Sequence, residues 1–291
     1  MPQDQPTGSP APSTRGPWWC PAAASLLGVL LMTGAQQPPA YPPQPPAGSQ
    51  PAGYQPQTST TTGPALGGPA ESPAAQLVNE ARLSFSRVRD YVGTMVKQER
   101  VGGQLLPEQA VAIRARTQPF SVYLKWQAPQ GMVGQEACFV AGKNNNQMRA
   151  KSAGLLGGVG FVSLDPRDPK AMKGNRHAIT EAGLGNLIER VATAHAQESR
   201  LPPSQVTTRY GEYLFQQRPC VRMEAVHLVN NGQFYCYRCV VYFDKETRLP
   251  VRFEAYDWPA AGGAPGGELL ECYSYIDLKF NVGLTDAAFN Y

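Results

Sequence analysis

The stretch that decides the fold is residues 213–258, YLFQQRPCVRMEAVHLVNNGQFYCYRCVVYFDKETRLPVRFEAYDW. It consists of short runs of β-branched and aromatic residues separated by turn signals, of which Asn231-Gly232 is the strongest. Connections this short can join only antiparallel neighbours, because a parallel crossover needs about a dozen residues or more. The stretch therefore predicts consecutive antiparallel strands, including strands at 234–243 and 249–258.

The same pattern continues toward both ends of the chain. Strict alternation along residues 120–126 predicts a strand with four apolar side chains on one face, namely Phe120, Val122, Leu124 and Trp126. Further strands are expected at 91–101, 136–140, 147–151 and 268–280. These strands are expected to form a sheet with one apolar face.

Apolar residues at helical spacing predict two amphipathic helices. The first begins at Ser72-Pro73, a helix-capping residue followed by proline, and runs to about Asp90. The second begins near Thr180 and carries one apolar stripe that consists of Leu184, Leu187, Ile188, Val191 and the core histidine His195. The expected class is α+β, one large antiparallel sheet with these helices covering a face.

Residues 1–35 are expected to direct export. The apolar stretch 18–32 follows Arg15 and precedes the small residues Thr33-Gly34-Ala35, which is the pattern of a secretory signal with cleavage after Ala35. A retained membrane anchor is the alternative interpretation. Either way, we expect the protein to lie in the periplasm or cell envelope.

Residues 36–70 have the composition of a disordered linker. They contain ten prolines and no charged residue, so they cannot form a core and favour an extended spacer. A proline-rich recognition peptide at 42–46 is the alternative. The folded domain is expected at 71–291.

Charge and motifs exclude several function classes. The net charge of +4 comes from 26 basic and 22 acidic residues without a basic run, which gives no support for nucleic-acid binding. The sequence contains no nucleophile elbow, phosphate loop or dinucleotide fingerprint. The pairs Glu99-Arg100 and Arg176-His177 are interpreted as surface or helix-entry residues. We expect no catalytic residue, no metal site and no cofactor.

The pair Cys236 and Cys239 has the spacing of a redox motif but lies in a predicted strand. An offset of three on a strand places two side chains on opposite faces, so the thiols are not expected to pair or to bind one metal. A two-residue turn at Asn231-Gly232 would place His227 across from Cys236, as neighbours on one sheet face. We assign no disulfide.

Four blocks of sequence resemble an uncharacterised family of exported bacterial proteins, and the likeness covers nearly all of 71–291. They are residues 116–126, 134–137, 244–252 and 275–281. The order of elements also resembles the LolA-type lipoprotein-carrier fold, shared with LppX-like and RseB/MucB-like periplasmic proteins. This resemblance implies a curved half-barrel sheet, helices as a lid, and a cavity for acyl chains. Arg114 and Arg116 both lie in the region where the carrier's functional arginine is expected.

Two functions follow from this resemblance. The first is an exported, non-enzymatic protein that binds a lipid or lipoprotein acyl chain. Its cavity would be lined by the eight apolar residues of the strand and the second helix, namely Phe120, Val122, Leu124, Trp126, Leu184, Leu187, Ile188 and Val191. The second is a cell-envelope module that senses or regulates another protein, with the same fold and no lipid cavity.

Overall fold

The computed structural model describes residues 71–154, 158 and 160–291. The predicted signal peptide and linker, residues 1–35 and 36–70, lie outside the described residues. Within the described residues, twelve strands form one antiparallel sheet. The strands are β1 (Asp90–Val101), β2 (Gln104–Leu105), β3 (Gln109–Arg116), β4 (Ser121–Ala128), β5 (Glu136–Val140), β6 (Met148–Lys151), β7 (Val162–Leu164), β8 (Val206–Phe215), β9 (Arg218–His227), β10 (Arg238–Asp244), β11 (Pro250–Tyr256) and β12 (Leu269–Phe280).

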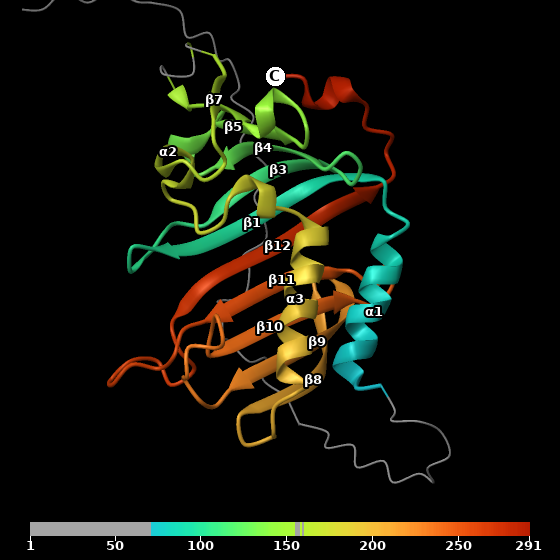
Figure 1. Ribbon diagram of the computed structural model, residues 1–291, viewed down its shortest axis with the longest axis vertical. Coiled ribbons are helices and arrows are strands. Elements are labelled where there is room, and N and C mark those ends of the chain that lie inside the picture. Colours follow the sequence, from blue (N-terminus) through green and yellow to red (C-terminus); the bar gives the residue numbers. More distant parts are fainter. Residues whose placement is uncertain (1–70, 155–157, 159) are drawn as a thin grey trace, which may run out of the picture. The chain divides into compact units, whose positions relative to one another are not determined.

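Two meanders of consecutive strands meet at β1 (Figure 1). The order across the sheet is β7-β6-β5-β4-β3-β1-β12-β11-β10-β9-β8, and the short β2 pairs only with β1. β1 pairs with β3 on one side and with β12 on the other, with Met95 opposite Tyr275. The strand that follows the first helix therefore joins the two meanders into a single sheet.

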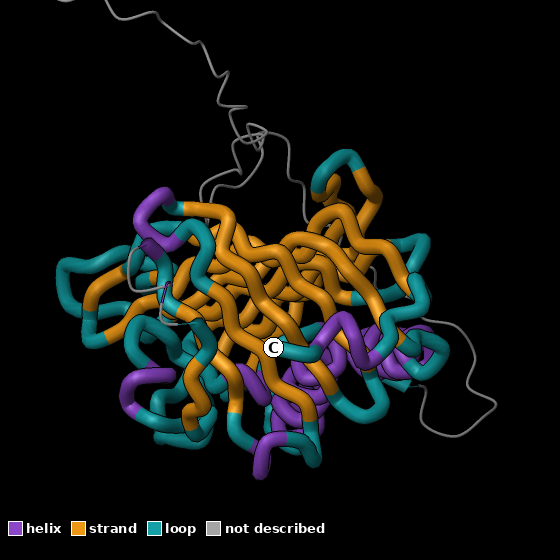
Figure 2. Tube along the Cα trace, turned by 90° about the horizontal axis from the view of Figure 1, so that it is seen from above, coloured by secondary structure: helices purple, strands orange, loops and turns teal. Residues whose placement is uncertain are grey.

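In the part of the chain that the structure describes, two long α-helices and one short α-helix accompany this sheet. They are α1 (Pro73–Phe85), α2 (Pro169–Met172) and α3 (Leu184–Glu198). The sheet is curved, and α1 and α3 lie together on one of its sides (Figure 2). The expected class, an α+β fold with a curved antiparallel sheet covered by helices, is confirmed. Among the described residues, no helix is long and apolar enough to cross a membrane.

Local chemistry fixes where the two long helices begin. The Ser72 hydroxyl accepts a hydrogen bond from the Ala75 backbone N–H, which caps α1 as expected. α3 begins after Gly183, whose φ of 97° favours glycine. The backbone N–H of Leu184 donates to the Tyr91 hydroxyl of β1 at 2.8 Å. β1 therefore positions the start of α3 over the sheet.

The side of the sheet that faces the helices forms the main core. Its largest buried cluster joins α1 and α3 to the inward-facing residues of β1, β3, β4, β5, β9, β10, β11 and β12. The alternation predicted for β4 is observed, because Val122, Leu124 and Trp126 belong to this core and Phe120 packs against it. Tyr123 points to the opposite face and stacks on Tyr291 with ring centroids 4.5 Å apart.

Several predicted element boundaries are wrong, and the second helix begins at Leu184 and not near Thr180. The first helix ends at Phe85 and not near Asp90, because β1 already begins at Asp90. Asn231-Gly232 does not form a two-residue turn, since β9 ends at His227 and β10 begins at Arg238. The ends of the resulting longer loop are held by hydrogen bonds from the His227 N–H to the Tyr237 carbonyl, and between His227 Nδ1 and the carbonyl of Cys236.

Candidate functional site

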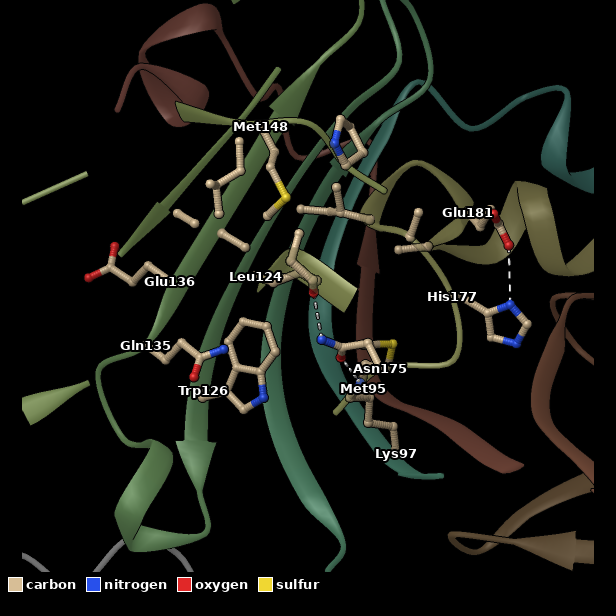
Figure 3. Close-up of a pocket in the computed structure, with 18 of the residues that line it drawn as sticks. Met95, Lys97, Leu124, Trp126, Gln135, Glu136, Met148, Asn175, His177 and Glu181 are labelled. Carbon is tan, nitrogen blue, oxygen red and sulfur yellow. Dashed lines mark hydrogen bonds and ion pairs between the residues drawn. The ribbon is translucent and has the colours of Figure 1, made fainter. Parts of the chain in front are cut away.

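A cavity of about 580 Å³ lies between the sheet and the segment that leads into α3 (Figure 3). We call it cavity 1. β1, β4, β5, β6, β7 and β12 form its strand wall, and the opposite wall comes from residues 166–183 together with α3. Its lining residues are Met95, Lys97, Glu99, Leu124, Trp126, Gln135, Glu136, Ala137, Met148, Ala150, Lys151, Ser152, Val162, Leu164, Pro166, Lys170, Ala171, Lys173, Asn175, His177, Ala178, Ile179, Glu181, Ala182, Gly183, Leu187, Arg190, Tyr273 and Tyr275.

The strand wall of cavity 1 carries an apolar patch next to its charged residues. Leu124 and Trp126 of β4 lie close to Met95 of β1 and Met148 of β6 (Figure 3). The indole N–H of Trp126 donates to Gln109 Oε1 at 2.7 Å, so the polar atom of this ring is already satisfied. Methionine side chains are flexible and polarizable, which lets them pack against ligands of irregular shape. This patch is suited to contact with hydrocarbon.

A buried ion pair marks the sheet at one side of the cavity. Lys97 and Glu99 project from β1 with side chains only 7% and 3% exposed, and their charged atoms are 3.0 Å apart. Lys97 Nζ also donates to Asn175 Oδ1 at 2.7 Å. The Tyr273 hydroxyl and the Arg176 backbone N–H both donate to the Glu99 carboxylate. These bonds attach the loop before α3 to the strands below it.

A second charged cluster surrounds Glu271 of β12, whose side chain is fully buried. His177 Nε2 lies 2.6 Å from Glu271 Oε2, and His177 Nδ1 lies 3.1 Å from Glu181 Oε2. Arg190 of α3 donates to Glu271 Oε1 at 3.2 Å, and Arg176 Nε lies 3.5 Å from Oε2. We call these five residues the Glu271 cluster. It connects α3 and the loop before it to the sheet through charge-assisted contacts.

The surroundings of Glu271 keep its carboxyl group ionised. Burial alone would raise the pKa of this carboxyl. The hydrogen bond with His177 and the positive charges of Arg190 and Arg176 outweigh burial, so the net shift lowers the pKa. The cluster therefore keeps a buried negative charge between two guanidinium groups.

A second cavity, of about 520 Å³, lies on the other side of this cluster. We call it cavity 2. Its lining residues are His177, Glu181, Glu189, Arg190, Val191, Thr193, Ala194, Gln197, Glu198, His227, Gln233, Phe234, Tyr235, Cys236, Cys239 and Phe253. At its far end, His227 stacks on Phe234 with centroids 3.8 Å apart, and its Nε2 lies 3.0 Å from Glu198 Oε1. His177, Glu181 and Arg190 line both cavities.

The structure divides the eight predicted cavity residues into three groups. Leu124, Trp126 and Leu187 line cavity 1, and Val191 lines cavity 2. The other four are part of the core and line neither cavity, namely Phe120, Val122, Leu184 and Ile188. The four residues in or next to β4 face the helices, and the four residues of α3 face the sheet. Residues that share a face in this way need not border the same cavity.

The charged residues of the site were not recognised from the sequence. The interpretation of Glu99-Arg100 and Arg176-His177 as surface or helix-entry pairs is wrong for Glu99, which is 3% exposed. These pairs meet, because Arg176 donates to the Arg100 carbonyl at 2.6 Å. The sequence contains a signal for Lys97 and Glu99. They lie two and four residues after the inward-facing Met95 on one strand, so all three side chains point to the same face. Arg114 and Arg116 bond to Tyr291 and Asp286 near the C-terminus and line neither cavity.

The cysteine pair differs from its predicted placement. Cys236 precedes β10, so the expectation that both thiols lie in one strand is wrong. Burial, with a smaller contribution from Glu271 and Glu198, raises the pKa of Cys236 to about 12. The thiol is therefore protonated at neutral pH and is a weak nucleophile. Within residues 71–154, 158 and 160–291, no group of three or more His, Cys, Asp or Glu side chains could hold a metal ion.

Several solved structures are similar to this chain. An uncharacterized conserved protein from Thermus thermophilus is 12% identical, with 76% of this chain and 94% of that chain covered and a TM-score of 0.43. The lipoprotein LppX of Mycobacterium tuberculosis is 11% identical, with 74% and 99% covered and a TM-score of 0.42. A putative outer membrane lipoprotein-sorting protein domain from Vibrio parahaemolyticus is 14% identical, with 75% and 97% covered and a TM-score of 0.35.

The comparison with family models identifies the group to which the chain is related. No curated protein matches the sequence. One family model, described as a protein of unknown function (DUF1571), matches residues 88–291. This range begins just before β1 and includes every strand of the sheet, both walls of cavity 1 and the Glu271 cluster. The uncharacterised family expected from the sequence is thereby confirmed: the chain belongs to the DUF1571 family.

Proposed function

We propose that this protein is an exported, non-enzymatic binding protein that holds a lipid or lipoprotein acyl chain in cavity 1. The observation that carries the proposal is an apolar patch on the strand wall, containing Leu124, Trp126 and Met148, next to a space of about 580 Å³. This volume lies within the range of about 300–1,000 Å³ that is usual for small-molecule pockets.

The physical gain from such binding comes from burying hydrocarbon. Each methylene group removed from water contributes roughly 0.8 kcal/mol. On the strand side of cavity 1 the charged groups are paired, Lys97 with Glu99 and Lys151 with Glu136, and on the opposite side His177 and Arg190 contact Glu271. An acyl chain on the apolar patch can therefore bind without breaking an ion pair.

Export is the part of the proposal that rests on the sequence. The apolar stretch 18–32 and the small residues that follow it have the pattern of a secretory signal. The proline-rich residues 36–70 would then place the binding domain at a distance from the membrane or from the cleavage site. We place the protein in the periplasm or cell envelope on this basis.

Quenching by a brominated fatty acid tests the proposal on the full chain. Stearic acid brominated in mid-chain should quench the fluorescence of Trp126, because this residue lines cavity 1. The variant Trp126→Phe should bind the same fatty acid without this quenching, which separates Trp126 from Trp18, Trp19 and Trp258. Absence of both binding and quenching in the natural sequence would contradict the proposal and favour an envelope protein–protein module.

A further inference from the structure

We propose that cavity 2 is a second hydrocarbon site, so that the ligand is an amphiphile with two apolar arms, one in each cavity. The proposal rests on the proposed function and specifies its ligand. The polar junction between the arms lies at the Glu271 cluster, because His177, Glu181 and Arg190 line both cavities.

The lining of cavity 2 suits an apolar arm. Val191 and Ala194 of α3 lie on one side, and Phe234, Cys236 and Phe253 contribute apolar surface on the other. The polar groups at the far end are already paired, since His227 bonds to the Cys236 carbonyl at 2.7 Å and to Glu198 at 3.0 Å. Its volume of about 520 Å³ is close to that of cavity 1. A hydrocarbon arm can therefore enter without leaving a buried charge unpaired.

The charged cluster between the cavities determines the form of the ligand. One continuous hydrocarbon chain passing from one cavity to the other would have to lie against the ionised groups of Arg190 and Glu181, whose side chains are 30% and 32% exposed. Covering partly exposed charges with hydrocarbon removes their hydration without replacing it. An ester or phosphate group at this point would instead accept hydrogen bonds from Arg190. The polar part of the ligand therefore lies at the cluster, and each arm occupies its own cavity.

Two soluble lipids with the same headgroup distinguish a site for one hydrocarbon arm from a site for two arms. Dioctanoyl phosphatidylcholine and palmitoyl lysophosphatidylcholine carry similar total hydrocarbon, in two short arms and in one long arm respectively. The test measures the binding of each lipid to the full chain by native mass spectrometry and isothermal titration calorimetry. It compares the natural sequence with variants that fill one cavity.

Ala194→Trp fills cavity 2 from a half-buried position on α3, and Gln197→Trp fills it from an exposed position that folding tolerates more readily. Both variants should weaken dioctanoyl lipid binding by about tenfold or more, because several methylene groups lose their site. Binding of the one-armed lipid should change by less than about twofold. The matched control Ala196→Trp lies on the same helix, is exposed and lines neither cavity. It should leave binding of both lipids unchanged.

Ala150→Trp, in the wall of cavity 1, should weaken binding of both lipids. Unchanged binding of the two-armed lipid in Gln197→Trp and Ala194→Trp would overturn the second site while leaving the proposed function intact. Failure of the natural sequence to bind either lipid would overturn both.

Discussion

The helices α1 and α3 lie on the same side of the sheet, yet they pack in different ways. No residue of α1 lines either cavity, and its inward residues Ala74, Val78 and Ala81 are buried in the core. α3 is also apolar on its inner face, but it borders both cavities. One helix forms solid core, and the other forms the wall of a site.

The difference follows from the size and charge of the inward side chains. α1 places only apolar residues toward the core, with Ala74, Val78 and Ala81 buried and Leu77 and Phe85 packed against the cluster, so the helix can pack closely against its neighbours. α3 instead carries Arg190 and Glu198, which reach Glu271 and His227 of the sheet. Long charged side chains must keep their partners and cannot interdigitate like apolar ones, so space remains beside them. The cavities occur where α3 meets the sheet through ion pairs.

The largest expected effect is the loss of the buried carboxylate under α3. Glu271→Ala leaves Arg190, His177 and Arg176 without their shared partner, and it should lower the free energy of unfolding by about 3–5 kcal/mol. The control is Glu189→Ala, which removes the exposed ion pair between α3 and Arg82 of α1. That change should cost less than about 1 kcal/mol. Urea denaturation measures both, and equal losses would contradict the structural importance of the cluster.

Two leucines of α3 compare solid core with cavity wall. Leu184 is fully buried and lines neither cavity, whereas Leu187 lines cavity 1. Leu184→Ala should cost about 2–5 kcal/mol, because it creates a new void. Leu187→Ala should cost clearly less, since space already exists beside it, and Leu124→Ala should behave in the same way while weakening acyl-chain binding. Thermal unfolding measures the stability loss of each variant. Losses at Leu187 and Leu124 as large as the loss at Leu184 would show that cavity 1 is filled with packed side chains.

Enlarging an alanine tests the same contrast in the opposite direction. Ala81 of α1 is fully buried, so Ala81→Leu should overpack the core and cost about 1–3 kcal/mol. Ala194 of α3 borders cavity 2, so Ala194→Leu has room and should change stability by no more than about 0.5 kcal/mol. Denaturant midpoints compare the two variants. A larger loss at Ala194 than at Ala81 would reverse the comparison of the helices.

The smallest expected effect is the pH dependence that Glu271 contributes. Its folded-state pKa is lowered, so the folded state favours the ionised carboxylate and gains stability at pH values above the unfolded pKa of about 4.3. This contribution is lost as the pH falls through the lower, folded-state pKa. Glu271→Gln should make the acid limb of a stability–pH profile less steep. An unchanged acid limb would show that other carboxyl groups control acid unfolding.

The sequence predicted the sheet and the apolar stripes well, because both follow from short-range periodicity. Alternation identified the inward face of β4, and helical spacing identified the inner face of α3. Neither pattern reports whether a residue such as Val122 packs against a neighbour or, like Leu124, borders a space. That outcome depends on which segment covers each residue.

The charged cluster could not be predicted for a related reason. Its members come from the loop before α3, from α3 itself and from β12, and only the long-range pairing of β1 with β12 brings these parts together. Glu271 lies in a strand of mostly buried residues, where an isolated carboxylate is costly unless it is paired. A charge at an inward-facing strand position was therefore the signal for this site, although the sequence did not identify its partners.

Native mass spectrometry of the full chain, purified gently from cell membranes, shows whether cavity 1 holds an acyl chain. If cavity 1 holds an acyl chain, the protein should co-purify with a species that has the mass and fragmentation of an acyl lipid. That species should be lost in Ala150→Trp, which fills cavity 1, and retained in the exposed control Ala196→Trp. Ligand-free protein alone from the natural sequence, folded and unable to take up added fatty acid, would contradict the proposed function.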